Sequence, residues 1–278
     1  MKQLYDHVSI KCSKLTTRSY STSFSMGIKF LNKRFRNPIY AIYGFVRFAD
    51  EIVDTFHAYN KVELLKRFRH DTYNAIDEKI SLNPILNSFQ QVVHGYNINM
   101  ELINAFLDSM QMDLERKTYD QGGYEKYILG SAEVVGLMCL KVFTENNTAL
   151  YKSLEFNAMK RGSAFQKINF LRDLKADYYE LGRVYFPGVD MRNFNAGIKK
   201  EIEKNIEIDF REGYEGIKKL PKDARFGVYV AYVYYYRLFK KIKGLPAEKI
   251  LRERIRIPNN KKYGLFLGSY VKHSLNLL

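Results

Sequence analysis

Residues 169–177 read Asn-Phe-Leu-Arg-Asp-Leu-Lys-Ala-Asp, and residues 50–54 read Asp-Glu-Ile-Val-Asp. Each segment carries two carboxylates four positions apart, which are the pairs Asp50/Asp54 and Asp173/Asp177. In a helix this interval places both carboxylates on one face, with Cβ atoms about 6 Å apart. Four converging carboxylates raise one another's pKa, so a site that keeps them ionised needs cations. Mg²⁺, which binds carboxylates together with substrate phosphates, suits this role, so the pairs predict an enzyme that binds a diphosphate.

The neighbours of the first pair extend it into a polar stripe. Steps of four, three and four residues place on one helical face Tyr43, Arg47, Asp50 and Asp54. An exposed face with an ordinary Asp–Arg ion pair, worth only about 0.3–0.5 kcal/mol, would show the same pattern. The first stripe alone therefore leaves a metal site and a solvated face as open alternatives.

The second pair belongs to a similar stripe on an otherwise apolar segment. Its members, at steps of three, four and four, are Gln166, Asn169, Asp173 and Asp177. Two such stripes in one chain favour a shared site over two unrelated solvated faces. We therefore expect the two pairs to face each other across one cavity.

The remaining punctuation of the chain is helical. Asn37-Pro38 and Asn83-Pro84 each place a capping side chain before a proline at a predicted first helical position. Leu154–Leu181 reads as one long helix that carries the second pair, and Tyr263–Leu278 can form the last helix. No period-two alternation is long enough for a strand. The sequence predicts a single all-α domain over residues 1–278, a helical bundle with its site on facing helices around a central cavity.

Composition and charge narrow the setting and the partners. Hydrophobic residues make up 46% of the 278 residues and aromatic residues 15%, enough for a sizeable core. The net charge of +15 favours anionic partners, namely diphosphates, an anionic membrane surface or nucleic acid. The amino terminus lacks the apolar run of a signal peptide, and no run reaches the roughly 18 apolar residues of a membrane span. The segment that comes nearest to such a span is Phe226–Tyr236. A cytoplasmic protein is therefore expected.

With these motifs in view, the chain resembles the squalene/phytoene synthase family over nearly its whole length. The two acidic segments match the family's signature motifs, and Gly-Arg-x-Tyr-Phe-Pro at 182–187 follows the second as it does in the family. Ser-Tyr-Ser at 19–21 matches the amino-terminal substrate-contact region. Residues 127–138, Tyr-Ile-Leu-Gly-Ser-Ala-Glu-Val-Val-Gly-Leu-Met, match the central helix. The joint pattern is highly specific.

The resemblance implies head-to-head coupling of two isoprenyl diphosphates in a bundle of isoprenoid-synthase type. One diphosphate ionises, the double bond of the other captures the cation, and a cyclopropylcarbinyl diphosphate forms, ionises again and rearranges. By resemblance, Mg²⁺, or Mn²⁺ as an alternative, is held by Asp50, Asp54, Asn169, Asp173 and Asp177. The residues implied in substrate contact are Ser19, Ser21, Tyr43, Arg47, Tyr127, Gln166, Arg172, Tyr235 and Lys261.

The chain departs from the family's pattern at two places. Many members have Ala-Gly in the central helix where this chain has Ala132-Glu133, which puts a carboxylate near the expected isoprenyl tails. At the carboxy-terminal basic element, Lys261 or Lys262 stands where an arginine is often found. For the tyrosine on the preceding helix, Tyr235 is preferred, with Tyr232 and Tyr236 as alternatives.

Within the family we favour phytoene synthase acting on two geranylgeranyl diphosphates in carotenoid biosynthesis. The runner-up is a dehydrosqualene or squalene synthase that uses farnesyl diphosphate. The form of the first motif favours the phytoene product, and no nicotinamide cofactor is expected. Two other classes stay open, a non-catalytic assembly protein and a basic nucleic-acid binder. The first should lack motif aspartates and the second should gather basic residues on its motif helices, so neither is favoured. Peripheral binding at the inner face of an anionic membrane is a further hypothesis for the basic charge.

Overall fold

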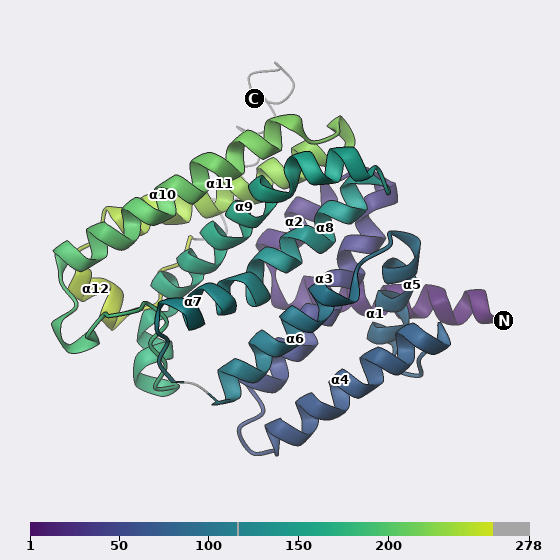
Figure 1. Ribbon diagram of the computed structural model, residues 1–278, viewed down its shortest axis with the longest axis horizontal. Helices are drawn as coiled ribbons and strands as arrows, with labels where there is room; N and C mark the ends of the chain where they lie inside the picture. Colours follow the sequence, from purple (N-terminus) through teal and green to yellow (C-terminus); the bar gives the residue numbers. More distant parts are fainter. Residues whose placement is uncertain (116, 258–278) are drawn as a thin grey trace.

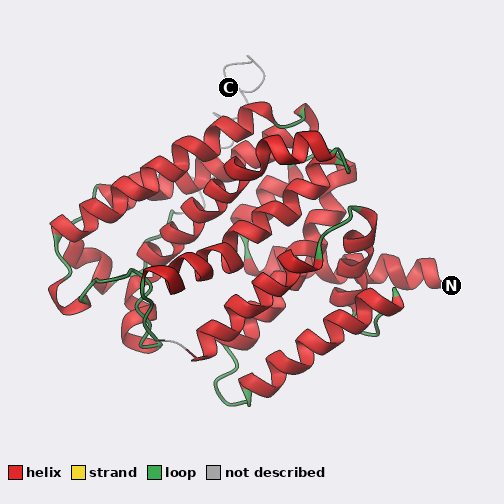
Figure 2. Cartoon of the chain, in the orientation of Figure 1, coloured by secondary structure: helices red, strands yellow, loops and turns green. Residues whose placement is uncertain are grey.

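The computed structural model describes residues 1–115 and 117–257. The helix predicted for Tyr263–Leu278 and the two candidate lysines, Lys261 and Lys262, lie outside these ranges. Within them the chain is helical throughout, and its extended pairing is limited to an isolated bridge between Thr118 and Val184 (Figure 2). The predicted all-α fold is confirmed.

The helices follow one another with short connections, and most run roughly alongside their neighbours (Figure 1). The first half comprises α1 (Lys2–Tyr20), α2 (Thr22–Lys29), α3 (Lys33–Asp54), α4 (Lys61–Glu78), α5 (Pro84–Gly95) and α6 (Met100–Glu115). The second half comprises α7 (Gln121–Ile128), the π-helical turn η1 (Leu129–Glu133), α8 (Val134–Thr144), α9 (Thr148–Lys175), the π-helical turn η2 (Ala176–Glu180), the 3₁₀ turn η3 (Met191–Asn193), α10 (Ala196–Lys219), α11 (Lys222–Lys243) and α12 (Ala247–Arg252).

Asparagine side chains begin many of these helices, because the amide oxygen can accept from the free backbone N–H groups of the first turn. They cap α3, α4, α5, α9 and α10 through Asn32, Asn60, Asn83, Asn147 and Asn195. The start predicted at Asn83-Pro84 is confirmed, since Asn83 accepts from Ile85 N at 3.0 Å.

The start predicted at Asn37-Pro38 is wrong. Helix α3 begins at Lys33, and Asn32 provides its cap by accepting from Arg34 N at 3.2 Å. Pro38 is therefore the sixth residue of the helix. Its missing N–H falls just past the first turn, where a backbone donor would otherwise serve the carbonyl of Arg34. The cap at Asn32, five residues before Asn37, therefore decides where the helix begins.

The long helix predicted for Leu154–Leu181 is confirmed in its body but begins earlier. Asn147 caps it at Thr148, and the α-helix continues to Lys175 before η2 carries the chain to Glu180. This second π-helical turn contains Asp177, and π-helical turns inside helices are common at functional sites.

Helices α7, η1 and α8 form one continuous apolar helix, Gln121–Thr144, that is long enough to cross a membrane. The expectation that Phe226–Tyr236 is the strongest candidate for such a span is therefore wrong. The mean hydropathy of its most apolar window is 1.5, and 56% of that window is buried inside the bundle, where it packs against α6 and α9. A buried core helix passes the same test, so this helix is weak evidence for a membrane span.

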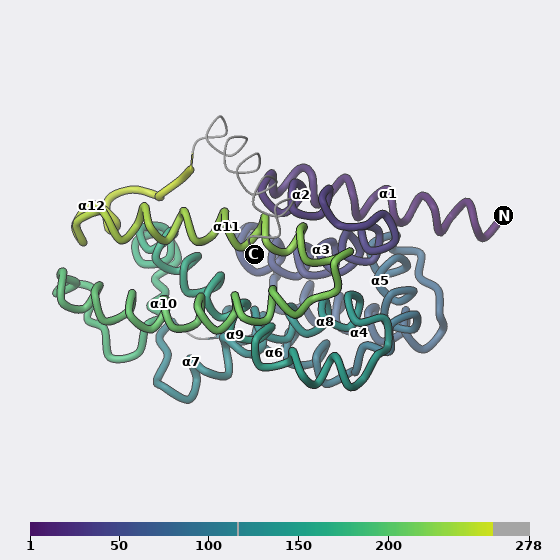
Figure 3. The backbone as a smooth tube through the Cα atoms, turned by 90° about the horizontal axis from the view of Figure 1, so that it is seen from above, coloured from purple at the N-terminus to yellow at the C-terminus, as the bar shows by residue number. Residues whose placement is uncertain are grey.

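The helices enclose two hydrophobic clusters with aromatic centres. In the first, the ring of Phe45 stacks on Phe89 with centroids 3.9 Å apart and meets Phe106 at 5.3 Å. In the second, Phe210 of α10 packs with Phe239 of α11 at 5.5 Å. Viewed from above, α11 and α12 lie on the same side of the molecule as α1 and α2 (Figure 3). Helices α2, α3, α6, α8, α9 and α11 surround a cavity.

Candidate active site

A cavity of about 320 Å³ lies inside the bundle, between α2, α3, α6, α8, α9 and α11. Most of its wall is apolar and aromatic. Polar side chains gather toward one part of it, namely Tyr43, Arg47, Asp50, Tyr127, Gln166, Asn169 and Tyr235. An apolar cavity with a few convergent polar groups is the usual form of a small-molecule site.

Three members of the first stripe, Tyr43, Arg47 and Asp50, line the cavity from α3, whereas Asp54 does not. The guanidinium of Arg47 donates to Asp50 and to Glu51 and lies over the ring of Tyr20, with its central carbon 4.3 Å from the ring centroid. Its Nε is buried and has no hydrogen-bond partner among the described residues. Arg47 therefore has a donor left for a ligand oxygen, and Arg is well suited to phosphate.

The second stripe faces the same space from α9. Asn169 donates to Gln166 Oε1 at 3.2 Å and accepts from the Tyr235 hydroxyl at 3.3 Å. One turn further along, Asp173 accepts from Arg172 Nε at 3.0 Å and lies 2.7 Å from the Nε of Arg254. The carboxylate of Asp173 thus lies between two guanidinium groups.

The electrostatics indicate that the two pairs lie close enough to interact. Burial and the charge of Asp54 raise the pKa of Asp50 to about 7. Burial, together with the charges of Asp173 and Asp54, raises the pKa of Asp177 to about 8. Because Asp54 acts on both Asp50 and Asp177, the carboxylates of α3 and η2 share one field.

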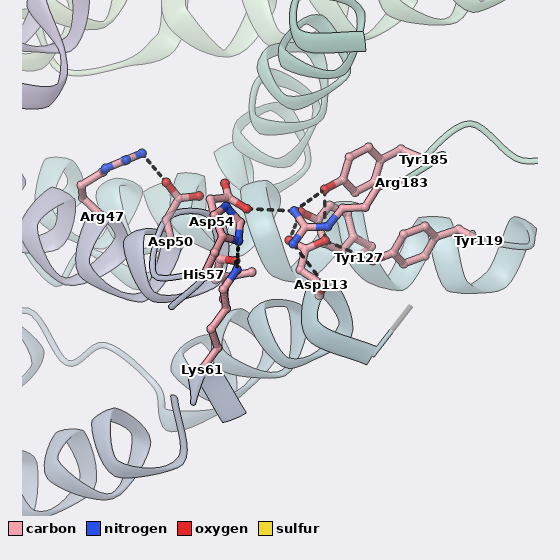
Figure 4. Close-up of polar contacts among 11 residues, drawn as sticks. Arg47, Asp50, Asp54, His57, Lys61, Asp113, Tyr119, Tyr127, Arg183 and Tyr185 are labelled. Carbon is pink, nitrogen blue, oxygen red and sulfur yellow. Dashed lines mark hydrogen bonds and ion pairs between the residues drawn. The ribbon is translucent and has the colours of Figure 1, made fainter. Parts of the chain in front are cut away.

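A second set of polar contacts surrounds Asp113 of α6 (Figure 4). Its carboxylate accepts from the hydroxyl of Tyr127 at 2.6 Å, of Tyr185 at 3.1 Å and of Tyr119 at 3.2 Å. Arg183 connects this group to the first acidic pair, because its Nη1 donates to Asp54 Oδ1 at 2.8 Å and its Nη2 to the carbonyl of Asp113 at 3.1 Å.

Comparison with known proteins identifies the family of this chain. The family model for squalene/phytoene synthase matches residues 17–261, most of the chain and all four motif aspartates. The chain belongs to the squalene/phytoene synthase family. Of the four aspartates, Asp50 of α3 lines the cavity, whereas Asp54, Asp173 and Asp177 lie outside its described lining.

Relatives and a solved structure of the family support the same assignment. The chain is 27% identical over 195 residues to the 4,4'-diapophytoene synthase of Staphylococcus haemolyticus, covering 68% of this chain and 65% of that protein. It is 25% identical over 269 residues to the chloroplastic phytoene synthase 1 of Solanum lycopersicum, covering 87% of this chain and 62% of that protein. The chain thus spans less than two thirds of the length of either relative. A ligand-bound crystal structure of a dehydrosqualene synthase has the same fold, with a TM-score of 0.81, 22% identity and 97% and 98% of the two chains covered.

The acidic residues of this family member fit a divalent cation by their chemistry. The carboxylates supply the oxygen ligands that Mg²⁺ prefers. Burial first and neighbouring carboxylates second raise the pKa values of Asp50 and Asp177, and a bound cation would offset both effects. In the described part of the chain, no three acidic, histidine or cysteine side chains are already gathered as a set of ligands. The carboxylates of the two pairs therefore interact with one another but do not form a preassembled set of metal ligands among the described residues.

The other predicted site residues occupy three kinds of position. Tyr235 lines the cavity, whereas its alternatives, Tyr232 and Tyr236, pack with centroids 5.5 Å from the ring of Phe210. Arg172 lies beside Asp173. Neither serine is among the lining residues: Ser19 is exposed at the end of α1, and Ser21 caps α2 by accepting from Phe24 N at 3.1 Å. The side chain of Ser21 nevertheless interacts with Tyr43, which lines the cavity.

The unusual glutamate of the central helix does not line the cavity. The carboxylate of Glu133 accepts a hydrogen bond from the hydroxyl of Ser163, which is 2% exposed, and thereby links η1 to α9. Among the described contacts, Glu133 therefore connects two helices and does not contribute to the cavity lining.

Sequence reasoning missed Asp113, Arg183 and Arg254. Arg183 had a signal, since it follows Gly182 in the family motif, and the φ of +66° at Gly182 is a conformation that glycine adopts without steric cost. The turn there directs Arg183 back toward α3 and α6. Asp113 had no comparable signal, because a single acidic residue near a helix end is usually exposed.

Proposed function

We propose that this chain catalyses head-to-head coupling of two geranylgeranyl diphosphates to phytoene through a cyclopropylcarbinyl diphosphate. The observation that carries the proposal is one apolar cavity whose polar lining includes Arg47 and Asp50 from the first stripe and Gln166 and Asn169 from the second. Relatives named for phytoene and for diapophytoene both match the chain. The length of the isoprenyl chain is the finer part of the proposal.

Some residues of the cavity would bind the diphosphate, and others would surround the isoprenyl tail. Ionisation breaks the bond between C1 and oxygen, and the departing diphosphate takes the electron pair. Arg47 and Arg172 would donate to its oxygens, which lowers the barrier because the charge develops where the donors already lie. Asp50, Asp54, Asn169, Asp173 and Asp177 would hold Mg²⁺, which supplies Lewis-acid stabilisation to the diphosphate when bound.

The apolar wall protects the cation until a carbon–carbon bond forms. Phe165 stacks on Tyr235 with centroids 4.0 Å apart, and the ring of Phe24 lies 5.7 Å from that of Tyr43. Such ring faces exclude water and attract a cation by cation–π interaction. The cation can then add to the double bond of the second substrate, with loss of a proton, to form the cyclopropane. The cyclopropylcarbinyl diphosphate then ionises, its diphosphate leaves with the electron pair, and the rearranged cation loses a proton to give the coupled hydrocarbon.

The product of the purified protein tests this proposal. Incubation with geranylgeranyl or farnesyl diphosphate and Mg²⁺, with and without reduced nicotinamide, is followed by mass spectrometry of the hydrocarbon. A C40 product without reductant is expected. A C30 product from farnesyl diphosphate alone would contradict the proposed tail length but keep the coupling. No turnover under any condition would contradict the enzyme proposal and favour a non-catalytic assembly role.

Arg161 supports farnesyl diphosphate as the second candidate. It lines the cavity from α9, is 9% exposed, and makes no hydrogen bond or ion pair with another described residue. It precedes Asp173 by twelve positions, about 18 Å along the helix. From carbon–carbon bonds of about 1.5 Å, an extended farnesyl chain spans about 14 Å and a geranylgeranyl chain about 19 Å. The end of the longer chain would thus lie beside a guanidinium.

We expect Arg161→Leu to favour the longer substrate. Leucine removes a buried charge and leaves an apolar wall, so the kcat/KM ratio of geranylgeranyl over farnesyl diphosphate should rise about tenfold, equivalent to about 1.4 kcal/mol. The variant should also melt at a higher temperature, because the unpaired guanidinium costs free energy when buried. Arg225→Leu, which removes an arginine that caps the carbonyl of Leu220 outside the cavity, is the control and should leave the ratio unchanged. An unchanged ratio in Arg161→Leu would contradict this reading of the cavity.

We expect the stabilisation of the protein by Mg²⁺ to grow with pH. The folded-state pKa values of Asp50, about 7, and Asp177, about 8, lie above the ordinary value of 3.8. Ionisation of these groups therefore destabilises the metal-free fold as pH rises toward 8, and below about pH 6 protons compete with the ion. The rise in melting temperature on adding Mg²⁺ should be larger at pH 8.5 than at pH 6. In Asp177→Asn the difference between the two pH values should shrink, and an equal difference in both proteins would contradict the assignment.

A further inference from the structure

Asp113 is a buried carboxylate that three tyrosine hydroxyls contact. It is 8% exposed, and its oxygens accept from Tyr127, Tyr185 and Tyr119 at 2.6, 3.1 and 3.2 Å. The rings also contact one another: Tyr119 stacks on Tyr185 with centroids 5.6 Å apart, and Tyr127 lies 5.1 Å from Tyr185 (Figure 4). Since a carboxylate only accepts hydrogen bonds, each of these phenols must point its hydrogen at Asp113.

Of these three tyrosines, Tyr127 alone lines the cavity. Because its hydrogen is committed to Asp113, the oxygen lone pairs and the ring of Tyr127 are what a bound ligand meets. Burial and the neighbouring Asp113 charge raise the pKa of Tyr127 well above its usual range, so the phenol stays protonated. A negative charge behind the ring strengthens its attraction for a cation in front of it. The carboxylate itself lies outside the lining and so does not touch the cation.

Arg183 gives Asp113 a second connection, to the first acidic pair. The guanidinium bridges from the carbonyl of Asp113 to the carboxylate of Asp54. Arg183 reaches the Asp113 carboxylate through Tyr185, because its Nη1 donates to the Tyr185 hydroxyl at 3.4 Å and that hydroxyl donates to Asp113 Oδ1 at 3.1 Å.

We propose that Asp113 is a positioning residue for the coupling reaction, which holds the oxygen and ring of Tyr127 toward the carbocation and shares Arg183 with Asp54. The inference rests on the proposed function, because it requires a carbocation in the cavity. Asp113 acts through Tyr127 and Arg183 and makes no contact with the substrate. Through its hydrogen bonds with Tyr127 and Tyr185, the carboxylate of Asp113 connects α6 with α7 and with the segment after η2.

The test replaces Asp113 by asparagine, which keeps an acceptor oxygen and the side-chain shape. We expect kcat to fall about 10²-fold, the scale of losing one preorganised electrostatic contact, while KM changes less than about threefold. Asp209→Asn is the matched control. Asp209 is also a buried carboxylate, at 3% exposed, and it pairs with Lys167 at 2.6 Å away from the cavity lining. The control should lower the melting temperature and leave kcat unchanged.

A double-mutant cycle separates positioning from a structural role. In Tyr127→Phe the phenol that Asp113 holds is gone, so adding Asp113→Asn should lower kcat by less than about threefold more. Two effects that multiply would overturn the proposal, as would a folded Asp113→Asn protein with wild-type kcat.

Binding of Mg²⁺ with inorganic diphosphate, measured by calorimetry, tests the Arg183 connection without turnover. Asp113→Asn keeps the backbone hydrogen bond of Arg183 but removes the nearby negative charge, so the guanidinium should pair more strongly with Asp54, compete with the cation and lower the affinity several-fold. Unchanged affinity would overturn this part of the proposal. Absence of turnover in the wild-type protein contradicts the proposed function instead, and the calorimetric result still decides the role of Asp113 toward Asp54.

Discussion

Asp173→Asn is expected to lower kcat by about 10²–10³-fold while leaving the fold intact. The carboxylate of Asp173 lies between the guanidinium groups of Arg172 and Arg254, at 3.0 Å from one Nε and 2.7 Å from the other. Asparagine keeps the shape but removes the charge that holds both groups and that would bind the cation. Asp50→Asn should have an effect of the same order, since Asp50 lines the cavity beside Arg47.

Steady-state kinetics with far-UV circular dichroism distinguishes lost chemistry from lost folding. Glu207→Gln is the control: Glu207 is an exposed acidic residue whose carboxylate lies 2.9 Å from the Nζ of Lys243, and its loss should leave kcat unchanged. A natively folded Asp173→Asn or Asp50→Asn protein with wild-type turnover would remove the acidic pairs from the proposed mechanism.

Gly130→Val is expected to destabilise the protein by about 3 kcal/mol or more, because overpacking a tight contact with backbone leaves little room for relaxation. A Cβ atom on Gly130 would lie 2.4 Å from the carbonyl oxygen of Ala105 and 2.6 Å from the Cβ of Ser109. Both atoms belong to α6, which crosses η1 here, so α6 or the central helix would have to move. That shift would also displace Asp113, four residues beyond Ser109 on α6.

Chemical denaturation measures this loss, and a second glycine on the same continuous helix gives the control. Gly122 has no atom within 4 Å of a built Cβ. Gly122→Ala should therefore leave stability unchanged or raise it by about 0.4–1 kcal/mol. A Gly130→Val protein as stable as the wild type would show that the helices can separate at this crossing at little cost.

Local patterns were reliable wherever short-range chemistry decides. Both stripes place members on the cavity wall, but of the four paired aspartates only Asp50 lines the cavity. Asn83 before Pro84 predicted the start of α5, because cap and proline act within one turn. The same reasoning failed at Asn37-Pro38, because the helix is already capped by Asn32, five residues before Asn37.

Contacts between distant segments could not be predicted in this way. Arg183 meets Asp54 across 129 positions and the carbonyl of Asp113 across 70, and Tyr185 reaches Asp113 across 72. No periodicity relates residues so far apart. Their meeting depends on how α3, α6 and the turn at Gly182 pack together.

The sequence by itself determined the all-helical fold, the two carboxylate stripes and the family, because each depends on residue types at short, regular spacing. The tertiary structure alone decided which charges share one field. It placed the guanidinium of Arg183 between Asp54 and Asp113, and that of Arg161 in an apolar wall. The physical reason is that burial and distance set the strength of a charge interaction, and both are properties of the packed bundle.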